Sequence, residues 1–189
     1  MLSTIVFCED RPASPSRRDL AELLARTLAS LVTAKVEGLL GDVRIAGPAG
    51  KNLSILANHA GCDLIEAENE AAWLGLALQE ARGPNVFLLR CGRIPEAGFI
   101  EEAGDFLASH SKDQPRAAYL HALPESFIER IFPSLAPVAG LIASRDLMLA
   151  APRGGFPKLA GFVAPAYFLR APAASADRVR CLLSRKDGS

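Results

Sequence analysis

Charged side chains follow two runs of apolar residues in this chain. Residues 85–90 read NVFLLR, and Arg93 follows Arg90 after a cysteine and a glycine. Guanidinium groups offer forked donors that suit the oxygens of a phosphate. A second polar pair, Glu9 and Asp10, follows the apolar run at residues 3–7. Both pairs are therefore candidate ligand-binding residues.

The elements that must position these residues alternate between strands and helices. β-Branched and aromatic residues predict strands at 3–7, 42–47, 62–67 and 85–90. Apolar residues at helical spacing predict helices at 20–32, 52–60 and 69–83, and a further helix that opens at Pro95. Ser16 and Asp19 are spaced to cap the first helix, and Gly61 and Gly83 are expected to end the next two.

This alternation predicts right-handed crossovers and a mostly parallel sheet. The expected fold is an α/β three-layer sandwich, α/β/α, in one domain over residues 1–189. Beyond about residue 110 the pattern is looser. There we expect an edge strand at 116–123, a helix at 125–132, a strand, short helix and glycine-rich turn over 138–156, an extended segment at 162–173 and a short helix in the tail.

Parallel sheets bind ligands at the carboxyl ends of their strands. The four predicted strands would place Glu9 with Asp10, Gly47, Glu66 and Arg90 at one rim. Arg90 has a simpler alternative role at this rim, in which it forms an ion pair with a nearby acid such as Glu66 and binds no ligand.

Composition excludes several classes of protein. Lysine plus arginine and aspartate plus glutamate both number 21, so the charge favours neither nucleic acid nor an anionic membrane surface. No apolar run reaches the length of a membrane span, and the N-terminus lacks a basic leader. The four cysteines are widely spaced, without a C-x-x-C pair, which favours reduced thiols in a cytoplasmic protein.

Common catalytic motifs are absent from the sequence. The stretch GPAGKN at 47–52 lacks the first glycine of a phosphate-binding loop, since that position is Ile45, and Asn52 replaces its Ser or Thr. The histidines are not spaced as metal ligands. We therefore predict no metal and no cofactor from local motifs.

Longer stretches resemble the family 2 glycosyltransferases, which have the A-type nucleotide-sugar transferase fold. TIVF…ED is similar to the family's first strand and nucleoside-binding acid, and NVFLLRCGRIPEAGFIEEA to its strand, metal-binding acids and following helix. GLIASRDLMLAAPRGGF is similar to the stretch before the catalytic acid. The resemblance implies a nucleotide-binding half over 1–110 and an acceptor-binding half with a tail over 111–189.

The functional acids of the family are missing at the matching positions. The metal-binding acids fall on Arg90, Cys91 and Gly92, the turn AGPAG has no aspartate, and KLAGFVAP holds no acceptor base. The resemblance thus implies a nucleoside diphosphate or nucleotide sugar as partner, with Glu9, Asp10, Gly47, Arg90 and Arg93 as candidate nucleotide-binding residues, but no catalytic residue.

Three functions are compatible with this pattern. The first is a glycosyltransferase-like protein that is catalytically impaired and acts as a binding or regulatory protein. The second is a metal-independent glycosyltransferase in which Arg90 and Arg93 stabilise the leaving nucleoside diphosphate. The third is a nucleotidyltransferase with a similar sheet. A homodimer is a further expectation, from the predicted edge at 116–123 and the apolar stretch IFPSLAPVAGLI.

Overall fold

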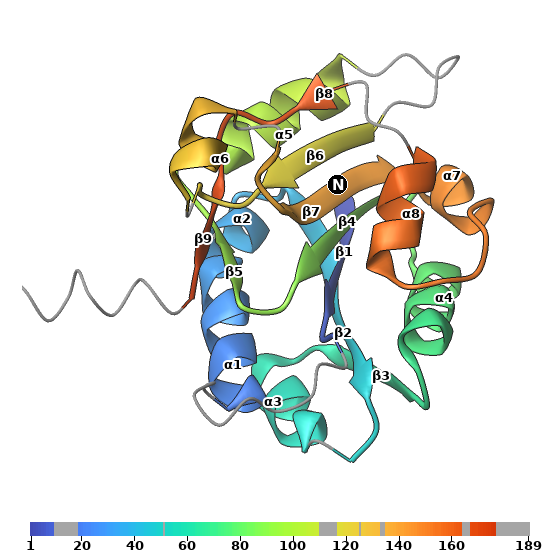
Figure 1. Cartoon of the computed structure of the whole chain (residues 1–189). Coiled ribbons are helices and arrows are strands. Elements are labelled where there is room, and N and C mark those ends of the chain that lie inside the picture. Colours follow the sequence, from blue (N-terminus) through green and yellow to red (C-terminus); the bar gives the residue numbers. More distant parts are fainter. Residues whose placement is uncertain are drawn as a thin grey trace, which may run out of the picture.

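A computed structural model describes residues 1–9, 19–50, 52–109, 117–124, 126–132, 135–163 and 167–176. In this part of the chain one sheet has the strand order β3-β2-β1-β4-β7-β6-β8 (Figure 1). Its strands are β1 (Leu2–Phe7), β2 (Leu40–Pro48), β3 (Asp63–Ala67), β4 (Asn85–Arg90), β6 (Ala117–His121), β7 (Val138–Ser144) and β8 (Tyr167–Phe168). Only β7 runs against the others, since it pairs antiparallel with both β4 and β6. The sheet is therefore mostly parallel, as predicted.

Helices cover both faces of the sheet. They are α1 (Leu20–Ser30), α2 (Val32–Val36), α3 (Leu53–Ala60), α4 (Glu70–Glu80), α5 (Phe99–Ala108), α6 (Phe127–Ile131), α7 (Arg145–Leu149) and α8 (Phe156–Val163). Residues of α1, α2, α3 and α5 share one apolar cluster with the sheet, and residues of α4, α7 and α8 share another. Figure 1 shows these two groups of helices on opposite sides of the strands. The predicted three-layer α/β/α sandwich is confirmed.

The four strands predicted in the first half of the chain are all present, with β1 in the middle of the parallel set. All six residues of β1 are buried. A strand covered by helices on both faces needs apolar residues at nearly every position rather than at alternate ones. The run STIVF has this composition, which is why the strand could be found from the sequence.

The helix predicted to open at Pro95 is present, but its predicted start is wrong, because the helix begins four residues later. Pro95 ends a short strand, β5 (Arg93–Pro95), which pairs antiparallel with β9 (Ala173–Ser175) in a separate ribbon. Helix α5 begins only at Phe99, after Gly98 with φ 93°. The fixed φ of proline suits an extended strand as well as a first helical turn, and the left-handed turn at Gly98 is what directs the chain into the helix.

The predicted stops of two helices have different outcomes. Gly61 ends α3 in the left-handed conformation, with φ 64°, as expected. Gly83 does not end α4, because the chain already leaves the helix at Ala81, which has φ −57° and ψ 128°. Gly83 instead donates its N–H to Ser3 Oγ at 2.7 Å, and a Cβ there would lie 3.0 Å from that oxygen. Close contact with β1 is thus the reason for this glycine.

The second half follows the predictions in part. Strand β7 and helices α6 and α7 lie where expected, whereas residues 162 and 163 belong to α8 and not to an extended segment. Strand β6 is not at the edge, since β8 pairs with its other side.

Asp19 caps α1 by accepting the N–H of Ala21 at 3.3 Å, as predicted. Ser16 and most of the predicted tail helix lie outside the described residues, and the division into two halves stays a prediction.

Among the described helices, none combines the length and the apolar character that crossing a membrane requires.

Replacing Leu88 with alanine tests the central sheet. Leu88 lies on β4 and is fully buried, so Leu88→Ala should lower the free energy of unfolding by about 2–5 kcal/mol. Leu76 is a matched control, because it is 42% exposed on α4, and Leu76→Ala should cost less than about 1 kcal/mol. Urea denaturation measures both. Equal losses would contradict the assigned burial of β4.

Candidate functional site

The strand pairing brings most of the candidate rim to one edge of the sheet. In the parallel ladders, Phe7 pairs with Ala46 of β2 and with Arg90 of β4, and Gly47 pairs with Glu66 of β3. The carboxyl ends of β1, β2, β3 and β4 therefore lie side by side, with Glu9 just beyond β1. Asp10 lies outside the described residues.

Arg90 forms an ion pair with Glu9 at this edge. Arg90 Nη2 lies 2.6 Å from Glu9 Oε1, and the two side chains are 15% and 17% exposed. Arg90 Nη1 also donates to the carbonyl oxygen of Val138 at 3.2 Å. The ion pair joins neighbouring strand ends, and its two formal charges cancel.

An aromatic side chain from the second half of the chain covers this ion pair. The Arg90 guanidinium carbon lies 5.8 Å from the ring centroid of Phe156, a cation–π distance. The Phe156 ring stacks on Phe7 with centroids 4.7 Å apart. The N–H of Phe156 donates to Glu70 Oε1 at 2.8 Å, so a carboxylate of α4 caps the start of α8. The Arg90 side chain thus makes an ion pair with Glu9, a hydrogen bond to the carbonyl oxygen of Val138 and a cation–π contact with Phe156.

Gly47 has a packing role. A Cβ at this position would lie 2.8 Å from Leu53 Cδ1 and 3.1 Å from Cys8 Cβ. Since Leu53 and Cys8 are fully buried, any larger residue would displace α3 or the end of β1. A role of Gly47 toward a nucleotide stays a prediction.

Arg93 lies on a different structural unit from Arg90. It is the first residue of β5 and pairs with Ser175 of β9, and its side chain is partly buried. Two residues separate the two arginines in sequence, yet Arg90 belongs to the main sheet and Arg93 to the small ribbon. Joint action of Arg90 and Arg93 on one diphosphate stays a prediction.

The residues at the end of β4 do not fit a divalent metal ion. Magnesium and manganese prefer oxygen ligands, above all carboxylates, whereas Arg90, Cys91 and Gly92 supply a guanidinium, a thiol and no side chain. The carboxylate close by, Glu9, is paired with Arg90. Within the described ranges, no cluster of three or more His, Cys, Asp or Glu residues could hold a metal.

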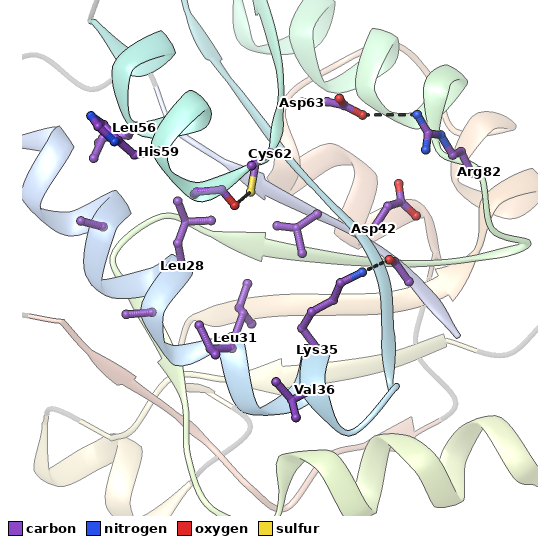
Figure 2. A pocket seen from close by; sticks show the side chains of 17 residues that line it. Leu28, Leu31, Lys35, Val36, Asp42, Leu56, His59, Cys62, Asp63 and Arg82 are labelled. Carbon is purple, nitrogen blue, oxygen red and sulfur yellow. Dashed lines mark hydrogen bonds and ion pairs between the residues drawn. The ribbon is translucent and has the colours of Figure 1, made fainter.

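A cavity of about 660 Å³ lies at the opposite, amino-terminal edge of the sheet (Figure 2). Leu28, Leu31, Val36 and Leu56 give it apolar walls, and Lys35, Asp42, Asp63 and Arg82 a polar margin. Cys62 also lines it, and burial, followed by the charge of Asp63, raises the pKa of its thiol. This cavity could not be predicted from the sequence, because its lining residues come from several elements and share no motif.

A chain of polar contacts runs beside this cavity. Gly83 donates to Ser3 Oγ at 2.7 Å, and Ser3 donates to Asp42 Oδ1 at 2.6 Å. The buried Arg44 donates from Nη1 to Asp42 Oδ2 at 2.7 Å, and its Nε lies 3.5 Å from Asp63 Oδ2. A buried guanidinium needs such paired carboxylates, because burying an isolated charge is costly. The amino ends of β1, β2 and β3 are thereby linked by side chains as well as by the ladder.

Comparison with solved structures identifies the fold. Glucosyl-3-phosphoglycerate synthase from Mycobacterium tuberculosis, in a complex with Mn²⁺, UDP and glucosyl-3-phosphoglycerate, superimposes with a TM-score of 0.65 at 14% identity, covering 97% of this chain and 75% of that one. TarS from S. aureus gives 0.60 at 15% identity over 94% of this chain and 61% of that one. HddC from Yersinia pseudotuberculosis gives 0.61 at 8% identity over 93% of each chain.

These similarities define the class of fold. The chain has the nucleotide-sugar transferase fold that the sequence resemblance implied. Neither a protein-family model nor a curated protein matches the sequence. Because these three structures share only 8% to 15% sequence identity with this chain, its activity and ligand have to be argued from its own residues.

The Glu9–Arg90 ion pair is expected to stabilise the folded chain. Arg90→Ala removes an ion pair, a carbonyl contact and a cation–π contact, so we expect a loss of about 1–3 kcal/mol in the free energy of unfolding. Glu9→Gln keeps the shape of Glu9 but removes its charge. A double-mutant cycle with Arg90→Ala and Glu9→Gln should give a coupling energy of at least about 0.5 kcal/mol.

Arg153 provides the control for this cycle, because it is an exposed arginine. Arg153→Ala should change the free energy of unfolding by less than about 0.5 kcal/mol and should show no coupling to Glu9→Gln. Additive effects of Arg90→Ala and Glu9→Gln would contradict the ion pair.

Proposed function

We propose that this chain is a cytoplasmic protein of the nucleotide-sugar transferase fold that lacks metal-dependent glycosyl transfer and acts as a binding or regulatory protein. The observation that carries the proposal is the Glu9–Arg90 ion pair, at 2.6 Å, where the resemblance places metal-binding acids. The three free thiols of Cys8, Cys62 and Cys91 are compatible with the cytoplasm.

The chemistry of glycosyl transfer explains why this change matters. A leaving nucleoside diphosphate develops negative charge, which a divalent ion or other cations must stabilise. Here the cation at the end of β4 is already neutralised by Glu9. The acceptor also needs a general base, and α8 contains no acid. The carboxylate that does contact α8, Glu70, accepts the N–H of Phe156 and serves as its cap.

The candidate ligand is a nucleoside diphosphate or nucleotide sugar, at the rim formed by Glu9, Asp10, Gly47, Arg90 and Arg93. The synthase from Mycobacterium tuberculosis, which has a similar fold, was crystallised with UDP. This supports a nucleoside diphosphate as the class of ligand here. A ligand diphosphate would compete with Glu9 for Arg90, so binding requires the ion pair to open.

Catalysis can be tested directly. UDP-glucose incubated with the protein in the presence of Mn²⁺, Mg²⁺ or EDTA should release no more UDP than a protein-free blank. Calorimetric titration with Mn²⁺ or Mg²⁺ should show no saturable binding, because a dication beside a guanidinium is disfavoured. Turnover that depends on the metal, or a saturable micromolar metal site, would overturn the proposal.

The ion pair predicts how substitutions of Glu9 and Arg90 change the affinity for a nucleotide. Glu9→Gln frees the guanidinium and should raise the affinity for UDP, whereas Arg90→Ala should lower it by about ten- to a hundredfold, since a charge-assisted contact is worth about 1.5–3 kcal/mol. Arg90→Lys should recover part of the loss, because lysine lacks the forked donors. Isothermal titration with UDP measures all four proteins. Equal affinities would exclude Arg90 from the ligand site.

The second candidate function is a metal-independent glycosyltransferase. The closeness in sequence of Arg90, at the end of β4, and Arg93, at the start of β5, is the observation that favours it, because two guanidinium groups can replace the charge of a dication. Turnover of UDP-glucose that persists in EDTA and disappears in Arg90→Ala would establish this function instead. Absence of both turnover and UDP binding would exclude this function and favour a protein that binds other partners.

A homodimer is part of the proposal as well. Ile131, Phe132 and Leu135 are 54%, 57% and 61% exposed, and a dimer would cover them. The strand at 116–123 was expected to offer a free sheet edge to a second copy of the chain. That expectation is wrong, because β8 already pairs with that side of β6. Light scattering at increasing protein concentration measures the oligomeric state.

A further inference from the structure

Cys8 and Cys91 lie opposite each other just beyond the paired ends of β1 and β4. Phe7 is the register partner of Arg90, and the N–H of Cys91 donates to the carbonyl oxygen of Phe7 at 2.9 Å. The parallel pairing thus continues by one residue. Because side chains alternate along a strand, Cys8 and Cys91 point away from Phe156 and toward the face covered by α1 and α3. Both belong to the apolar cluster on that face.

The two thiols interact directly. A hydrogen bond with Cys91, followed by burial, raises the pKa of the Cys8 thiol well above its usual range. Neighbouring strands lie about 4.7–4.9 Å apart, which is within the Cα separation of about 4.4–6.8 Å that disulfides require. Both cysteines are free thiols in this structure. The pair therefore has the spacing for a disulfide without a large movement of the backbone.

We propose that Cys8 and Cys91 form a redox-active dithiol that closes to a disulfide on reaction with a thiol oxidant, such as a small disulfide, and reopens on reduction. Cys91 is partly exposed and Cys8 is fully buried, so Cys91 reacts first. With oxidised glutathione, the Cys91 thiolate attacks one sulfur and releases one glutathione thiol. Cys8 then attacks the mixed disulfide and releases the second. The protein loses two protons and two electrons, and oxidised glutathione gains them.

The position of this dithiol links it to the candidate ligand site. Cys8 directly precedes Glu9, and Cys91 directly follows Arg90. A disulfide would tie the two strand ends together and hold Glu9 against Arg90, which should exclude a diphosphate. Formation of the disulfide does not depend on the proposed function, whereas its effect on nucleotide binding rests on that proposed function.

The test removes the other two cysteines first. Cys62 lies at the amino end of β3, at the edge opposite the dithiol, and Cys181 lies outside the described residues. In a Cys62→Ser, Cys181→Ser background, oxidised glutathione in mildly alkaline buffer should yield a species lighter by two hydrogens, because the thiolate is the attacking form. Peptide mapping should join Cys8 to Cys91, and dithiothreitol should restore both thiols.

Cys91→Ala and Cys8→Ala, each in the same background, are the controls. Alanine is used because serine would bury an unpaired hydroxyl at Cys8. Cys91→Ala should show no loss of hydrogens, and Cys8→Ala should stop at the mixed disulfide on Cys91. A circular dichroism melt of each variant establishes that it is folded. Two free thiols after oxidation of the folded background protein would overturn the proposal, as would a loss of hydrogens that persists in Cys91→Ala.

The effect on the ligand site is a separate measurement. UDP titrated into the reduced and the oxidised background protein should bind at least about tenfold more weakly to the oxidised form, a difference of about 1.4 kcal/mol. A disulfide that forms while both states bind UDP equally would overturn the regulatory part. A disulfide that forms while neither state binds UDP would remove the proposed ligand and leave the dithiol established.

Discussion

The backbone hydrogen bonds that hold β1 between β2 and β4 determine which side chains meet at the two edges of the parallel strands. All of β1 is buried, and its two parallel ladders align the ends of three strands. At the carboxyl edge this alignment brings Glu9 to Arg90 and Cys8 to Cys91. At the amino edge it brings Ser3 to Asp42. A change of register in β1 would move each of these side chains away from its partner.

The carboxyl edge of the sheet carries an arginine and a glutamate that neutralise each other. Open parallel sheets bind ligands at the carboxyl ends of their strands, and here the guanidinium of Arg90 on β4 lies at that edge together with the carboxylate of Glu9, just beyond β1. A metal ion or a ligand diphosphate that binds here would first have to separate these two opposite charges, of which little is exposed. The same contacts that stabilise the free protein therefore limit what the site can do.

Local sequence patterns were sufficient for the strands but not for the contacts between distant elements. The apolar runs at 3–7 and 85–90 give β1 and β4 because buried parallel strands need continuous apolar residues. Pro95 was misassigned because proline is compatible with a first helical turn and with an extended strand. The partner of Arg90 depends on strand order: Glu66 is on β3, beyond β2, whereas Glu9 follows the neighbouring β1. Phe156 belongs to α8, and no local pattern could place it over Arg90.

The polar chain at the amino edge constrains how this sequence can change over evolutionary time. Ser3, Asp42, Arg44 and Asp63 come from three different strands, and each satisfies a buried or partly buried group of the next. Loss of Asp42 alone would leave a buried guanidinium without its closest carboxylate. Substitutions at these positions are therefore epistatic, and homologous sequences should either keep the whole set or replace several members together by apolar residues.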